Sequence, residues 1–260
     1  MVAMPIRAQV LAVANQKGGV AKTTTVASLS AAWAEMGRRV LMVDLDPQSC
    51  LTFSVGYDPE TLERSVHQVL LGEVAAKDAV LPTEDGPDLL PATIELAAAE
   101  QMLLMRTGRE QLLKSALKPL LTAYDDIILD CPPTLGILTT LALTAADRVL
   151  IPLQCETLSH RGVGQLLDTI YDVRSITNRR LKVLGVLPTL YDARTTHGRT
   201  VLERIGEDYG VPVLSPPIPK SVRFAEAPAV GRSILHTARA NRGAAAYRDV
   251  ARQLVAGTAH

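Results

Sequence analysis

Aromatic side chains and cysteines are scarce in this chain. Its 260 residues include two Phe, one Trp and three Cys, so we expect an aliphatic core rich in Val, Leu and Ala. The cysteines at positions 50, 131 and 155 are odd in number and far apart, which excludes a disulfide framework and a Cys-x-x-Cys metal site. No histidine adjoins Cys131 in the sequence, so a nucleophilic thiol has little support.

The chain also lacks long apolar runs and an overall charge. No run approaches the ~20 apolar residues that span a bilayer, and residues 1–9 are too short and mixed for a signal peptide. The cytoplasm is therefore the default location. With 27 basic and 27 acidic residues, the net charge is zero and no global field attracts nucleic acid or membrane. The apolar content of 47% predicts a globular chain, which we interpret as one large α/β domain over residues 1–260.

Basic residues nevertheless gather near the carboxyl terminus. From Gly210 to the end, seven basic residues stand against two acidic ones. The basic residues are Lys220, Arg223, Arg232, Arg239, Arg242, Arg248 and Arg252, and the acidic ones are Glu226 and Asp249.

The stretch from Asn15 to Thr25 has the pattern of a phosphate-binding loop. It follows an apolar run, Val10 to Ala14, typical of a buried parallel strand, and precedes Val26 to Met36, which has helical spacing. Strand, glycine loop and helix is the context that such a loop requires. Its backbone N–H groups can surround an anion, and the unpaired donors and dipole of the helix N-terminus add to the attraction.

Individual loop residues can be given roles on this basis. Lys22 would reach the β- and γ-phosphates, and the Thr23 hydroxyl would ligate Mg²⁺. The loop residues that we expect to contact a nucleotide are Gly18, Gly19, Val20, Ala21, Lys22, Thr23 and Thr24. The alternative to nucleotide binding is that the glycine pair only ends the strand.

Carboxylates follow two further apolar runs. Val40–Val43 is followed by Asp44 and Asp46, and residues 127–129 are followed by Asp130. In a parallel sheet the carboxyl ends of these strands lie beside the phosphate loop. Carboxylates there hold Mg²⁺ or orient the attacking water. Aspartates that only cap a turn are the alternative for the first pair.

Because Lys17 precedes the glycine pair, the loop K-G-G-V-A-K-T resembles the deviant Walker A motif of the ParA/MinD group of P-loop ATPases. D-L-D-P-Q from Asp44 resembles the switch I of ParA proteins, and D-C-P-P from Asp130 resembles their switch II. Residues 188–196 and 218–228 resemble two later loops of the family. These motifs occur in the family's order over nearly the whole chain, in the small, Soj-like form. Ala21 departs from the family's glycine, and a left-handed conformation there would cost roughly 1–2 kcal/mol.

The resemblance implies a doubly wound, mostly parallel α/β sheet flanked by helices and a Mg²⁺-dependent ATPase. It implies catalytic roles for Lys17, Lys22 and Asp44: Lys17 would reach the nucleotide of a partner copy, and Asp44 would polarise the attacking water. Thr23, Asp44 and Asp130 would form the Mg²⁺ site, and Pro219 would contact the adenine.

The resemblance also implies partners. An ATP-bound homodimer would bind DNA without sequence preference, a ParB-like protein would stimulate hydrolysis, and the chain would associate with the nucleoid in the cytoplasm and not with a membrane. The candidate DNA contacts are Arg194, Arg199, Lys220, Arg223, Arg239 and Arg242. Arg223 is the first of these candidates. For each of the six residues, the alternative is an ordinary solvated surface side chain with no DNA contact.

Two other functions stay open. A MinD-like positioning ATPase would bind membranes through a carboxyl-terminal amphipathic helix, but the tail from Ala244 to His260 has few bulky apolar residues to insert. An interaction module could bind nucleotide yet barely hydrolyse it because of Ala21.

Overall fold

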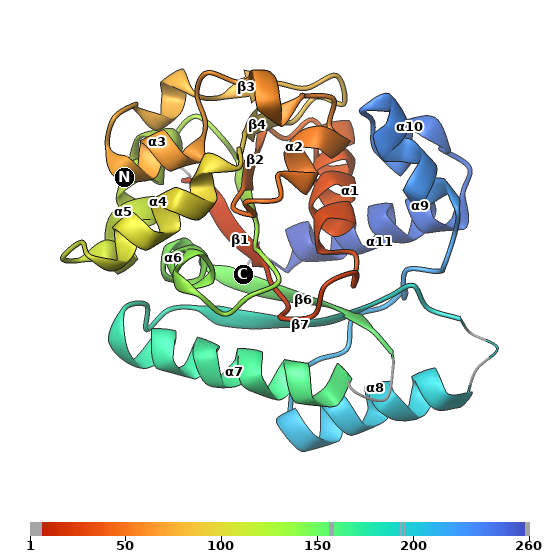
Figure 1. The fold of residues 1–260 in the computed structure, drawn as a ribbon. Coiled ribbons are helices and arrows are strands. Elements are labelled where there is room, and N and C mark those ends of the chain that lie inside the picture. Colours follow the sequence, from red (N-terminus) through yellow and green to blue (C-terminus); the bar gives the residue numbers. More distant parts are fainter. Residues whose placement is uncertain (1–6, 156–158, 193, 195, 258–260) are drawn as a thin grey trace, which may run out of the picture.

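A seven-stranded sheet with helices on both faces is the framework of residues 7–155, 159–192, 194 and 196–257, the part of the chain that the computed structural model describes (Figure 1). The strand order is β3-β4-β2-β5-β1-β6-β7. Neighbouring strands are parallel except β3 and β4, which are antiparallel. The strands are β1 (Gln9–Val13), β2 (Val40–Asp44), β3 (Leu81–Pro82), β4 (Asp88–Leu90), β5 (Asp126–Asp130), β6 (Arg148–Gln154) and β7 (Lys182–Thr189).

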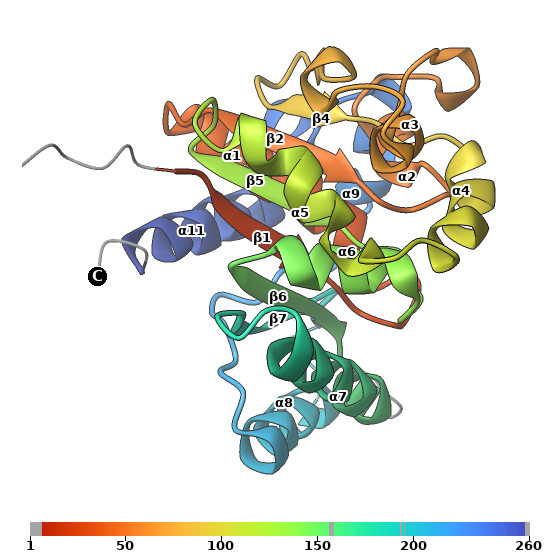
Figure 2. The ribbon, with the colours of Figure 1, turned by 90° about the vertical axis from the view of Figure 1, so that its left-hand side faces the viewer.

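The helices form two layers, seen from two sides in Figures 1 and 2. Helices α1 and α11 cover one face together with the short α10, and α4, α5, α6 and α7 cover the other. The helices are α1 (Lys22–Glu35), α2 (Cys50–Ser54), α3 (Val66–Leu71), α4 (Glu95–Leu104), α5 (Leu112–Leu117), α6 (Ile137–Ala145), α7 (Ser159–Ile176), α8 (Thr196–Tyr209), α9 (Arg223–Glu226), α10 (Ile234–Thr237) and α11 (Arg242–Ala256).

Strand β1 shows how the sequence divides the core between these layers. Val10 and Ala12 belong to the cluster under α4–α7, whereas Leu11 and Val13 belong to the cluster under α1 and α11. Because successive strand residues point to opposite faces, a strand covered on both sides must be apolar throughout. The predicted doubly wound fold with an aliphatic core is confirmed.

The two largest fully buried side chains join α1 to α11. Trp33 donates from Nε1 to the carbonyl of Ala251 at 3.1 Å, and the hydroxyls of Thr25 and Tyr247 lie 2.9 Å apart. These contacts satisfy the polar atoms of both aromatic residues inside an apolar interface. The apolar side of the last helix is therefore part of the core.

Some predicted boundaries were wrong. The helical period over residues 109–123 predicts one helix, but these residues form the short α5 with a 3₁₀ turn on either side. Pro119 lies in the second of these turns, where its missing N–H interrupts the helix. The sequence predicts a helix from Gly164 to Ile176, and α7 begins earlier, at Ser159. Helix α8 has no counterpart among the predicted elements.

The order of the strands brings three loops together. Strand β1 lies between β5 and β6. The chain leaves β1 toward β2 on one side of it, and later returns from β5 to β6 on the other side, so the strand order reverses direction at β1. Asp130 pairs with Val13 on one side and with Asp44 on the other. The carboxyl ends of β1, β2 and β5 therefore meet at the point where ligands bind in open parallel sheets.

Candidate nucleotide site

The loop after β1 contains two residues in the left-handed conformation. Gly19 has φ 73°, and Ala21, at the N-cap of α1, has φ 65° and ψ 34°. The carbonyl of Ala21 accepts the Thr25 N–H at 2.9 Å, so this turn closes directly into the helix. Ala21 thus has the strained conformation for which the family's glycine is suited, at a cost of about 1–2 kcal/mol.

Hydrogen bonds to a backbone carbonyl of β6 and from a side chain of β7 hold the loop in shape. The Thr189 hydroxyl donates to the carbonyl of Val20 at 2.9 Å. Asn15 donates from its amide to the carbonyl of Pro152 at 2.7 Å and accepts the Lys17 N–H at 3.0 Å. The loop therefore has a shape set before any anion binds.

Lys22, Thr23 and Asp130 lie together at the start of α1. Lys22 is 7% exposed and donates from Nζ to the carbonyl of Lys17 at 3.1 Å. The Thr23 hydroxyl donates to Oδ2 of Asp130 at 2.7 Å. Burial lowers the pKa of Lys22, an effect that the nearby Asp130 opposes. Burial, and then the charge of Asp44, raise the pKa of Asp130 well above its ordinary value.

Asp44 is fully buried beside this group. Its Oδ1 accepts the Asp46 N–H at 3.1 Å, and its Oδ2 accepts the Thr52 N–H at 2.9 Å and the Thr52 hydroxyl at 2.8 Å. Burial raises the pKa of Asp44 to about 6, against the opposing effect of the hydrogen bonds from Thr52. Thr52 was absent from the predicted site, because no motif links a helix residue to a carboxylate eight positions earlier.

The site suits Mg²⁺ by the chemistry of its donors. Oδ1 of Asp130 is buried without a hydrogen-bond partner in the described structure, and the Thr23 hydroxyl adjoins the other oxygen. Mg²⁺ prefers such hard oxygen ligands and is commonly held by one or two carboxylates together with substrate phosphates. Within the described ranges no group of three or more His, Cys, Asp or Glu forms an all-protein metal site. Thr23 and Asp130 would hold the ion, which supplies positive charge to the phosphates.

Pro219 lies in a loop joined to the end of β7. The Tyr191 N–H donates to the carbonyl of Ile218 at 2.9 Å, and the Lys220 N–H donates to the carbonyl of Tyr191 at 3.2 Å. Pro219 lines a cavity of about 630 Å³, and none of the described residues around this cavity comes from the phosphate loop. Its contact with adenine stays a prediction.

Three of the candidate DNA contacts lie around that same cavity. Arg194, Lys220 and Arg242 line it and are exposed. Arg194 is 89% exposed and forms an ion pair with Asp192 at 2.7 Å. Asp249 is a second carboxylate at this cavity.

The remaining candidates lie elsewhere. Arg223, at the start of α9, forms an exposed ion pair with Glu226 at 2.7 Å. Arg239 lines a different cavity of about 260 Å³, together with Glu35 and other charged residues. The side chain of Arg199 lies outside the described residues.

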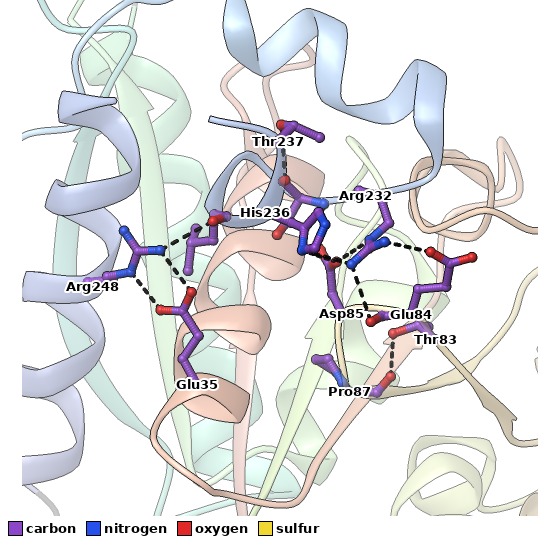
Figure 3. Close-up of polar contacts among 11 residues, drawn as sticks. Glu35, Thr83, Glu84, Asp85, Pro87, Arg232, His236, Thr237 and Arg248 are labelled. Carbon is purple, nitrogen blue, oxygen red and sulfur yellow. Dashed lines mark hydrogen bonds and ion pairs between the residues drawn. The ribbon is translucent and has the colours of Figure 1, made fainter. Parts of the chain in front are cut away.

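Two carboxyl-terminal arginines form ion pairs with carboxylates of other segments of the chain (Figure 3). Arg232 contacts Asp85 at 2.5 Å and Glu84 at 2.6 Å, which ties the segment before α10 to the turn between β3 and β4. Arg248 contacts Glu35 at 2.6 Å, which ties α11 to the end of α1. The carboxyl-terminal excess of basic residues is therefore smaller at the surface than in the sequence.

The fold and this loop define a P-loop nucleotide-binding protein. A family model described as an AAA domain matches residues 8–183. The chain is 42% identical over 249 residues to the sporulation initiation inhibitor protein Soj of Bacillus subtilis, covering 95% of this chain and 98% of Soj. It is 39% identical over 258 residues to the chromosome partitioning protein ParA of Caulobacter vibrioides, covering 98% and 96%.

Solved structures agree with this class. One, titled cobyrinic acid a,c-diamide synthase from Mycobacterium smegmatis with bound ATP analog and magnesium, is 58% identical with a TM-score of 0.86 and covers 95% of this chain and 94% of that one. The cell division ATPase MinD of Pyrococcus furiosus shares the fold, with a TM-score of 0.77 at 24% identity, and covers 95% of this chain and 98% of its own. The chain belongs to the ParA/Soj family of deviant Walker A P-loop ATPases. It is an ATPase that uses ATP and Mg²⁺.

Proposed function

We propose that this ATPase partitions DNA. Two copies would pair around ATP, bind DNA through its phosphates without sequence preference, and release it when a ParB-like partner stimulates hydrolysis. The observation that carries the proposal is the loop geometry: Lys17 precedes the glycine turn, and its backbone is held by Asn15 beside the buried Lys22. Relatives named for chromosome partition over nearly the same length support it. We further propose a single domain over residues 1–260 and nucleoid association in the cytoplasm.

The site residues divide by role. Backbone N–H groups of residues 18–24 would bind the phosphates, since residues 18–21 lead into the N-terminus of α1 and residues 22–24 form its first turn. Lys22 would contact the transferred phosphate, and Lys17 would reach the nucleotide of the paired copy. Asp44 would hold the attacking water, and Thr23, Asp44 and Asp130 would form the Mg²⁺ site.

The cavity that Arg194, Lys220 and Arg242 share is the best supported DNA contact in the described structure. Positive charges close together bind phosphates in any sequence, and binding releases counterions. Arg223 and Arg239 would contribute less, because neither lines this cavity and each therefore lies apart from the other candidate cations.

Retention of DNA fragments tests this proposal. Without nucleotide or with ADP, binding should be weak; with ATP and Mg²⁺, it should be tight and should fall steeply as salt rises. Lys220→Ala or Arg242→Ala should weaken binding to all sequences alike and reduce the salt slope by about 1. The control Lys182→Ala removes an exposed lysine at the other end of β7 and should change nothing. Binding that ignores salt or nucleotide would refute the proposal.

A membrane-binding role has less support from the last helix. The apolar side chains of α11, including Tyr247, Val250 and Leu254, are buried against the core and not presented outward. None of the helices in the described ranges has the length and apolarity needed to cross a bilayer. Sedimentation with anionic vesicles in ATP would reveal such binding if it occurs.

An interaction module with little hydrolysis is the second alternative, because Ala21 is strained. Single-turnover ATPase assays with and without DNA separate it from a partition ATPase. In the partition model Asp44→Ala loses hydrolysis but retains DNA with ATP. A chain that stays monomeric in saturating ATP and Mg²⁺ would contradict pairing altogether.

Amide synthesis is a further candidate, favoured by the 58% identity to the chain titled cobyrinic acid a,c-diamide synthase. ATP would then activate a carboxylate for attack by ammonia. Phosphate release that requires cobyrinic acid and an ammonia donor would support this role. Phosphate release stimulated by DNA alone would support partition.

A further inference from the structure

The side-chain hydroxyl of Thr52 is buried, and the direction of its proton is fixed by its neighbours. It lies in α2, is 0% exposed, and its Oγ1 accepts the N–H of Ala92 at 3.0 Å. The same oxygen lies 2.8 Å from Oδ2 of Asp44. A threonine hydroxyl has a single proton. Because an N–H points at the oxygen from the side of Ala92, that proton is directed at Asp44.

The two oxygens of Asp44 differ as a result. Oδ2 accepts two hydrogen bonds, from the Thr52 N–H and the Thr52 hydroxyl. Oδ1 accepts one, from the Asp46 N–H at 3.1 Å. Each carboxylate oxygen has about two acceptor positions. Oδ2 is therefore saturated, and Oδ1 keeps a position for one more donor.

We propose that Thr52 is a positioning residue for ATP hydrolysis: it holds Oδ2 of Asp44 so that Oδ1 accepts from the attacking water. The inference rests on the proposed role of Asp44. Thr52 does not touch the nucleotide in this arrangement; it acts through the carboxylate. The Ala92 N–H extends the support to the connection between β4 and α4, so the carboxylate is held against the sheet.

The effect of losing the hydroxyl can be separated from a loss of folding. Thr52→Val keeps the size and the backbone N–H but removes the hydroxyl, so Asp44 gains freedom to rotate and Ala92 loses a partner. A displacement of a reacting group by about 1 Å can cost a hundredfold in rate. We expect kcat to fall about tenfold to a hundredfold, while the affinity for ATP changes less than about twofold, because Thr52 does not contact the nucleotide. Thr52→Ser, which keeps the hydroxyl, should restore kcat.

The experiment measures steady-state ATPase and ATP affinity of the full chain for these variants and for Thr52→Ala, which avoids a methyl group facing the carboxylate. The control Thr144→Val removes another buried hydroxyl, 2.8 Å from that of Thr177 in the interior, and should leave kcat unchanged. If Thr52→Val keeps its kcat, or if kcat, ATP affinity and thermal stability fall together as a structural role predicts, the inference is overturned.

A double-mutant cycle makes the test specific to Asp44. In an Asp44→Ala background, Thr52→Val should reduce hydrolysis no further, because the residues act as one unit. An additional loss would overturn the inference. If Asp44→Ala itself hydrolyses ATP normally, the proposed role of Asp44 fails first. If Asp44→Ala loses hydrolysis but Thr52→Val keeps the wild-type kcat, the positioning role alone fails.

Discussion

Replacing Ala21 by glycine should stabilise the nucleotide-free protein. Ala21 has φ 65° and ψ 34°, and a left-handed alanine costs roughly 1–2 kcal/mol. Glycine removes that cost but loses about 0.5–1 kcal/mol more backbone entropy on folding. We therefore expect a net gain of about 0.5–1 kcal/mol in the free energy of unfolding. For a chain of this size that corresponds to a rise in Tm of about 1–4 °C.

Thermal unfolding followed by circular dichroism, without nucleotide, is the assay. Ala98→Gly is the matched control, since Ala98 is exposed inside α4, where glycine should lower the stability by about 1 kcal/mol. Replacing alanine by glycine should thus raise the stability at position 21 and lower it at position 98. Ser49, with φ 54°, should respond like Ala21. If Ala21→Gly lowers Tm as Ala98→Gly does, the reasoning from the left-handed conformation is refuted.

Two further predictions concern contacts between distant segments. Gly231 has φ 66°, and a Cβ there would lie 2.6 Å from the Cα of Gly56. Gly231→Ala should therefore lower the free energy of unfolding, measured in urea, by more than about 1 kcal/mol. The control Gly257→Ala, whose Cβ would meet only ordinary van der Waals contacts, should be close to neutral. The hydrogen bond from Arg248 lowers the pKa of Glu35, so the pair stabilises the folded state above the ordinary pKa of glutamate, and this contribution is lost as pH falls through the lowered value. Melting curves of the wild type and Glu35→Gln should therefore differ at pH 7 and converge in acid; a constant difference would contradict the assignment.

The phosphate loop and the three central strands could be predicted from sequence because their signals are local. The apolar run before Asn15 and the lysine and threonine after the glycines are neighbours in the chain. Asp44 and Asp130 could be placed beside the loop since parallel strands end at one edge of a sheet. Residues 109–123 were predicted less well, because the helical period continues through Pro119 although the backbone does not.

The basic surface could not be predicted from composition. Seven basic residues stand against two acidic ones in the carboxyl-terminal segment, yet Arg232 and Arg248 form ion pairs with carboxylates far earlier in the chain. The gathering of Arg194, Lys220 and Arg242 at one cavity is likewise invisible in the sequence. Which arginines remain available depends on which carboxylates the fold brings to them.

The sequence by itself determined the class of this protein: a strand, a loop with two lysines and a helix, followed by carboxylates after apolar runs, are enough to predict ATP binding. Tertiary structure decided how those residues are held. The left-handed Ala21, the hydroxyl of Thr52 between Asp44 and Ala92, and the support of Val20 by Thr189 join residues distant in the chain or depend on their backbone angles. Periodicity and motifs report neighbours along the chain, whereas the direction of a hydrogen bond depends on neighbours in space.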